Sequence, residues 1–110
     1  MRREITISVG EGKLCLVVEG GPLSDWRKAV LMEEAGAVDG QGNLVRPLKG
    51  MEHLIKRLWP ERVKAVRGEG LSPEFLGRLP DALFDDPAVK VEDLVSLFQA
   101  LTGEGEEVGN

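Results

Sequence analysis

The chain has 110 residues, a hydrophobic content of 42% and a formal net charge of -5 at pH 7. These values predict one globular domain with a core of ordinary size. No stretch approaches the roughly 18 apolar residues of a membrane-spanning helix, and the N-terminus lacks the apolar segment of a signal peptide. The single cysteine, Cys15, cannot form an internal disulfide. We therefore expect a soluble cytoplasmic protein with a reduced thiol.

The first two predicted elements are β-strands. Apolar and polar residues alternate over residues 5–9 and again, after a glycine-containing break, over residues 14–18. This pattern predicts a β-hairpin. The second run is apolar on both faces, so we expect it to be the more central strand, with Cys15 and Val17 packed against another element.

The segment after the hairpin predicts a helix that runs to about Ala35. Ser24 is a favourable N-cap, Asp25 lies at the positive end of the helix dipole, and Gly36 is suited to end the helix. Leu31 and Met32 widen its apolar face. The residues expected to define that face are Trp26, Ala29, Val30 and Glu33.

Residues 37–45 predict a minor hairpin or a short third strand, because two apolar pairs flank a glycine-rich turn. Asp39–Asn43 places oxygen ligands at alternate positions, as a calcium loop does. However, Leu44 occupies the required glycine position and Gly50 the glutamate position of such a loop. We therefore interpret Asp39–Asn43 as a tight turn.

The next segment, after Pro47, predicts an amphipathic helix. Pro60 lacks a backbone donor and restricts Trp59, so we expect this helix to end or kink there, followed by a shorter turn through Val63 and Val66. The apolar stripe has the spacing i, i+3, i+4 and i+7. Its members are Met51, Leu54, Ile55 and Leu58.

Two more helices are expected in the C-terminal third. Ser72 and Pro73 form a helix start, and Pro80 should cut that helix short. After a turn at 85–87, a last helix should end at Gly103. Its expected apolar face is Val91, Leu94, Val95, Phe98 and Leu101.

Strands at the front of the chain and helices behind them predict an α+β fold. We expect a small antiparallel sheet, made of the N-terminal β-hairpin with a short third strand, packed against about four helices. Residues 1–102 should form a single globular domain. Residues 103–110 have almost nothing to bury and are predicted to be a flexible acidic tail.

Charge is segregated along the chain. From Leu79 onward, Lys90 is the only base among many acids. Such segregation creates a field that steers partners, which concerns association and not catalysis. Between residues 46 and 67 there is a local surplus of about five positive charges. The bases are Arg46, Lys49, Lys56, Arg57, Arg62, Lys64 and Arg67.

Pro60 divides these bases, so we expect them to crowd a corner between two elements. We call residues 56–67 the basic corner. Trp and Arg are enriched at binding hot spots. We therefore expect a non-enzymatic protein-protein interaction or assembly module that docks onto an acidic protein surface or onto the acidic C-terminal third of a second copy. The expected binding residues are Arg57, Trp59, Arg62, Lys64 and Arg67.

Two alternatives stay open. The first is a nucleic-acid-associated accessory protein, although no established binding motif is present and aromatic residues are scarce. The second is a small enzyme or ligand-binding protein whose site joins His53 to Asp39 or Glu52. The sequence contains no recognised nucleophile motif, metal-ligand set or phosphate loop, so we expect no catalytic residues, metal or cofactor.

Overall fold

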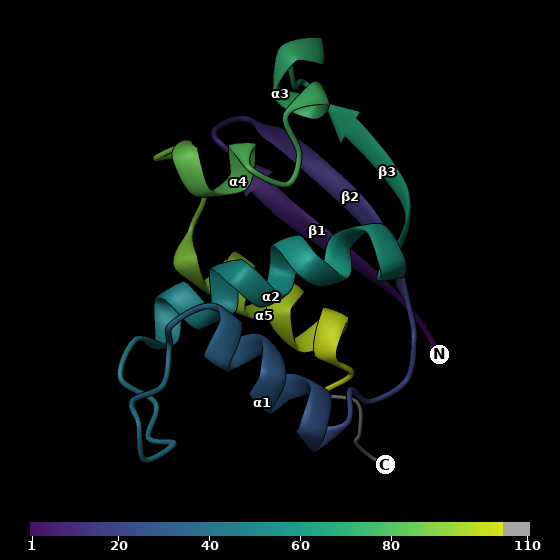
Figure 1. The fold of residues 1–110 in the computed structure, drawn as a ribbon. Coiled ribbons are helices and arrows are strands. Elements are labelled where there is room, and N and C mark those ends of the chain that lie inside the picture. Colours follow the sequence, from purple (N-terminus) through teal and green to yellow (C-terminus); the bar gives the residue numbers. More distant parts are fainter. Residues whose placement is uncertain (105–110) are drawn as a thin grey trace.

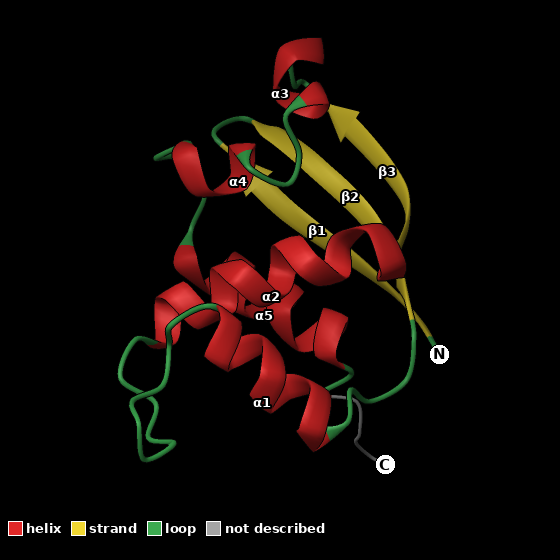
Figure 2. Ribbon diagram, in the orientation of Figure 1, coloured by secondary structure: helices red, strands yellow, loops and turns green. Residues whose placement is uncertain are grey.

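The computed structural model, which describes residues 1–104, has an α+β architecture with a three-stranded antiparallel sheet (Figures 1 and 2). The strands follow the order β1-β2-β3. Helices α2 and α5 lie against one face of the sheet, and α1 packs on α2. The strands are β1 (Arg2–Val9), β2 (Gly12–Glu19) and β3 (Val63–Glu69), and the helices are α1 (Asp25–Glu34), α2 (Pro47–Arg62), α3 (Pro73–Gly77), α4 (Ala82–Asp85) and α5 (Val91–Thr102).

The predicted N-terminal hairpin is confirmed. Gly10 has a φ of 61, which suits the tight turn between β1 and β2. Ile7 pairs with Leu14, and both are fully buried beneath the helices. The prediction that β2 is central is also confirmed. Cys15 and Val17, however, lie half-buried on the opposite face, which no helix among residues 1–104 covers.

Helix α1 has the predicted bounds but buries a different face. The Ser24 side chain accepts a hydrogen bond from the Arg27 amide, as expected of an N-cap. The buried side carries Leu31, whereas Trp26 is 79% exposed and Val30 is 37% exposed. The predicted face is therefore wrong for Trp26 and Val30, whereas Leu31 and Met32, which were expected to widen it, do contact the core. Apolar residues lie on two sides of this helix, and α2 covers the side that carries Leu31.

Helix α2 buries its predicted stripe of Met51, Leu54, Ile55 and Leu58. It does not end at Pro60 but continues to Arg62. A proline in the last turn removes only one intrahelical hydrogen bond, so the helix can continue past it.

The predicted turn through Val63 and Val66 is also wrong, because both residues belong to β3. This strand pairs with β2 and is the third strand of the sheet. Residues 37–45 form the minor hairpin that was one of the two expectations for them, closed by an isolated bridge between Val38 and Leu44, and they add no strand to the sheet.

The predicted helix starts and stops in the C-terminal third are confirmed. The Ser72 hydroxyl accepts from the Phe75 amide at the start of α3. Gly103 ends α5 in the left-handed conformation with a φ of 78. Helix α4 was not expected. On α5 the predicted face is only partly right, since Val91 and Val95 are exposed and Leu97 is buried instead.

Part of the predicted acidic tail is described. Gly103 is buried. The Glu104 carbonyl accepts a 2.8 Å hydrogen bond from Arg3 Nη1, and the Glu104 carboxylate lies 2.5 Å from Lys28 Nζ. Residues 105–110 lie outside the described residues. No helix within residues 1–104 is both long and apolar enough to cross a bilayer.

Candidate functional site

Three members of the basic corner lie at the end of α2. Arg57 is exposed, with Nη1 2.5 Å from Glu34 Oε1 on α1. Trp59 is half-buried and packs against the core. Arg62 Nη1 donates to the Gly21 carbonyl at 2.5 Å and to the Leu101 carbonyl at 3.0 Å. Arg62 therefore ties the segment before α1 to the last turn of α5, which is a structural role.

The other two members lie on β3. Lys64 Nζ donates to the Glu61 carbonyl at 2.8 Å. Arg67 lies 3.2 Å from Glu69 and 3.7 Å from the Cys15 sulfur, on the sheet face away from the helices. Arg57, in contrast, contacts α1 on the helical side. The structure thus places the five predicted residues on different sides of the molecule and does not join them into one surface.

Acids from outside residues 46–67 neutralise part of the positive charge in this segment. Lys56 Nζ lies 2.7 Å from Glu52 and 3.3 Å from Asp81. The hydrogen bond to Glu52 raises the pKa of Lys56. Arg57 pairs with Glu34 of α1. The surplus seen along the sequence is therefore smaller on the folded surface.

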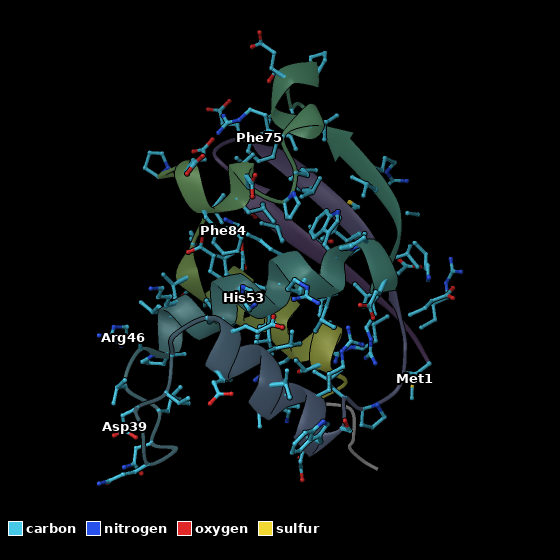
Figure 3. The ribbon with its side chains drawn as sticks, viewed as in Figure 1. Met1, Asp39, Arg46, His53, Phe75 and Phe84 are labelled. Atoms are coloured by element: carbon cyan, nitrogen blue, oxygen red, sulfur yellow. The ribbon has the colours of Figure 1, made fainter. Side chains whose placement is uncertain are left out.

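A polar depression of about 340 Å³ lies between α1 and α2. Within it, His53 Nε2 is 3.0 Å from Glu34 Oε1 (Figure 3). This hydrogen bond, together with the charge of Arg57, lowers the pKa of Glu34. The lining residues are Glu34, Ala35, Lys49, Glu52, His53 and Lys56.

The depression joins His53 to Glu52, as the ligand-binding alternative requires, but not to Asp39, which lies on the 37–45 hairpin (Figure 3). No hydroxyl or thiol lines it, so His53 has no nucleophile of these two kinds there to activate. Its two carboxylates already pair with His53, Arg57 and Lys56. We interpret this cluster as a polar contact that holds α1 against α2.

The interpretation of Asp39–Asn43 as a tight turn is confirmed. Asp39 Oδ1 accepts from the amides of Gln41 and Asn43, both at 2.9 Å. These hydrogen bonds, the one from Asn43 first, lower the pKa of Asp39. The carboxylate is therefore used to close the turn. Within residues 1–104, no group of three or more metal-binding side chains comes together.

A different surface stands out on the outward side of α1, and we call it the Trp26 surface. It forms a shallow apolar depression of about 230 Å³ between α1 and the 37–45 hairpin. The 79% exposed indole of Trp26 is its largest side chain. The residues of the Trp26 surface are Trp26, Ala29, Val30, Glu33, Val38 and Gly42.

The border of the Trp26 surface is acidic. Glu33 is the only charged lining residue, and exposed Asp25 precedes Trp26 in the chain. The two nearby bases of α1 are engaged elsewhere, because Arg27 pairs with Glu61 and Lys28 pairs with Glu104. An apolar centre thus lies beside carboxylates without a basic lining residue.

Comparison with known proteins gives no assignment: the chain matches no family model, no curated protein and no solved structure. The geometry of these surfaces is therefore the basis for a functional proposal. The Trp26 surface was missed in the sequence because apolar residues spaced i, i+3 and i+4 also indicate a core-facing stripe.

Proposed function

We propose that this protein is a non-enzymatic protein-interaction module that docks onto a partner protein through the Trp26 surface. The observation that carries the proposal is the 79% exposed indole of Trp26. Trp is enriched at binding hot spots, where an aromatic side chain fills a pocket of the partner. An enzymatic role has less support, because the polar depression at His53 offers no hydroxyl or thiol nucleophile among its lining residues and its carboxylates are already paired.

Trp26 leaves a large apolar side chain in water. Burying an aromatic side chain removes about 150–250 Å² from solvent. At about 25 cal/mol per Å², this would contribute several kcal/mol to binding before the costs of association are subtracted. Ala29 and Val30 lie one turn from Trp26 on the same side of α1 and enlarge the contact area.

Helix α1 is well fixed before any partner arrives. Ser24 caps its N-terminus, while Arg27 and Lys28 connect it to Glu61 and Glu104. Leu31 anchors it in the core. A rigid helix loses little conformational entropy when it binds, so more of the contact energy appears as affinity.

The charge of the border indicates the chemistry of the partner. Asp25 and Glu33 are exposed beside the indole, and the Asp39 carboxylate of the adjoining turn is exposed as well. A complementary partner has an apolar pocket bordered by Lys or Arg. The same carboxylates would repel a nucleic acid from this surface.

The basic corner stays a second prediction for docking. Lys64 and Arg67 remain exposed on β3, where an acidic protein surface, a second copy or a nucleic acid could reach them. Arg62 and Trp59 support this less, since they are half-buried within the fold. The expected cytoplasmic location also stays a prediction.

Selection from a displayed random-peptide library distinguishes the two surfaces. Peptides selected on the wild-type protein should be rich in apolar and basic residues. Trp26→Ala should weaken their binding about tenfold or more, as expected for a hot-spot residue. Leu48→Ala provides a matched control, because Leu48 is 63% exposed but lies outside the Trp26 surface.

Two outcomes would contradict the proposal. One is a set of selected peptides that bind Trp26→Ala as tightly as the wild-type protein. The other is a set of acidic peptides whose binding is lost in Lys64→Glu and Arg67→Glu, which would assign docking to the basic corner instead.

A further inference from the structure

The two edges of the sheet differ in how they are covered. At the β1 edge, Val9 forms a bridge with Val89, and the Ser8 amide donates to Asp93 Oδ2 at 3.2 Å. Helix α5 also contacts β1. Along the outer side of β3, no other element of residues 1–104 lies beside the strand (Figure 1). The β3 edge is therefore open.

The register shows which backbone groups face that edge. The Gly20 amide donates to the Met1 carbonyl, so even-numbered residues of β2 direct their backbone groups toward β1. Cys15 therefore directs its groups toward its β3 partner, Arg67. Because the direction alternates, the N–H and C=O groups of Val66 and Gly68 point away from β2. Among residues 1–104 neither residue has a hydrogen-bond partner at the open edge.

We propose that β3 of a second copy of this chain pairs with this open edge, antiparallel and about a two-fold axis at Val66. The three-stranded sheets would then join into one continuous sheet. Unpaired strand edges are templates for this kind of addition. The proposal concerns a different surface from the Trp26 surface and does not depend on it.

Charge and the length of β3 together select the position of the two-fold axis. An axis at Arg67 would place two guanidinium groups directly opposite each other, which is unfavourable in a cross-strand pair. An axis at Val66 places Arg67 opposite Ala65 and Glu69 opposite Val63 of the second copy. No like charges then face each other directly, and all of Val63–Glu69 is paired. An axis at Gly68 would place Arg67 opposite Glu69, but it would leave residues 63–66 opposite residues beyond the end of β3.

The side chain at the axis supports the same arrangement. Val66 is 44% exposed although it pairs with fully covered Leu16 in β2. Pairing about Val66 would bring the two valines together and remove apolar surface from water.

The length of the regular edge predicts a weak dimer. Val17 pairs with Ala65 and Val18 pairs with Val63, so Lys64 is an extra residue in a bulge. The regular strand beyond the bulge is short, and the contact falls far below the roughly 20–30 residues per side of a standard interface. We therefore expect dimerisation at high micromolar concentration or above.

Sedimentation equilibrium of the full chain from micromolar to millimolar concentration tests the proposal. A monomer–dimer equilibrium is expected. Val66→Pro removes the edge-facing N–H without removing a bond to β2, and it should weaken the dimer about tenfold or more because both copies lose a hydrogen bond. Val66→Thr keeps the N–H and the β-branched shape, so it should still dimerise.

A measurement on the wild-type protein is independent of how well Val66→Pro folds. Amide hydrogen exchange at Val66 and Gly68 should slow as concentration rises, whereas the Arg67 amide, which faces β2, should be protected at all concentrations. A monomer throughout, or rapid exchange at Val66 at millimolar concentration, would overturn the proposal. So would a dimer that Val66→Pro leaves intact or that Trp26→Ala abolishes.

Discussion

Helices α1 and α2 each carry one tryptophan and place it in opposite surroundings. Trp59 of α2 is half-buried against the core, whereas Trp26 of α1 is 79% exposed. Helix α2 is covered by the sheet on one side and by α1 on the other, but α1 forms the outer layer (Figure 1). An apolar stripe on a helix therefore predicts a contact face. It does not predict whether another element of the same chain buries that face or whether it stays exposed.

The largest expected effect on stability comes from the difference in burial between α2 and the outward side of α1. Leu54 is 0% exposed, so Leu54→Ala should lower the free energy of unfolding by about 2–5 kcal/mol. Val30→Ala removes a smaller apolar side chain from the outward side of α1 and should cost less than about 1 kcal/mol. Urea denaturation measures both. Similar losses would mean that the outward side of α1 is packed in solution.

The next effect tests the structural role of Arg62 beside Trp59. Arg62→Ala leaves the carbonyls of Gly21 and Leu101 without their donor and should cost about 1–3 kcal/mol. Arg57→Ala removes an exposed ion pair with Glu34 and should cost at most about 1 kcal/mol. Thermal or urea unfolding provides the comparison. Equal losses in the free energy of unfolding would mean that Arg62 is a surface residue, as its predicted binding role in the basic corner requires.

A smaller effect concerns the polar contact between α1 and α2. The pKa of Glu34 is lowered by His53 first and then by Arg57, so its contribution to stability is present above the unfolded-state pKa of about 4.3. The contribution is lost as the pH falls through the lower folded-state pKa. The difference in Tm between wild type and Glu34→Gln should therefore shrink between pH 5 and pH 3.

Glu33→Gln is the matched control for that experiment. Glu33 neighbours Glu34 in α1 but lies on the Trp26 surface, outside the contact with His53. Its Tm difference from wild type should show much less dependence on pH. A difference for Glu34→Gln that grows under acid would contradict the sign of the pKa shift.

The smallest effect on stability is expected at Trp26 itself. Because its side chain is mostly in water, Trp26→Ala should change the free energy of unfolding by less than about 0.5 kcal/mol, despite the size of the residue. Urea denaturation followed by circular dichroism avoids the loss of the fluorescent reporter. A loss of several kcal/mol would show that Trp26 belongs to the core.

Local signals in the sequence predicted much of the fold. The caps at Ser24 and Ser72, the stop at Gly103 and the hairpin turn at Gly10 each depend on residues within a few positions. The stripe of α2 also followed from its period, because its buried residues all lie on one side.

The errors concern contacts between distant segments. Strand β3 pairs with β2, but its sequence did not predict a strand, because charged residues between Val63 and Glu69 interrupt the apolar pattern. On α1 the spacing of the apolar residues was compatible with burial of either of two faces. The face that carries Leu31 is buried because α2 packs against it. The basic corner was inferred from neighbours in sequence, but strand and helix directions send Arg57 and Arg67 to different sides.

The fluorescence of Trp26 gives the most direct test of the proposed docking surface. In Trp59→Phe, Trp26 is the only tryptophan, and its emission should be typical of an indole in water. Saturation with a peptide selected on the wild-type protein should shift this emission to shorter wavelength and protect the indole from acrylamide quenching. Unchanged emission and quenching when the peptide is fully bound would show that docking occurs elsewhere.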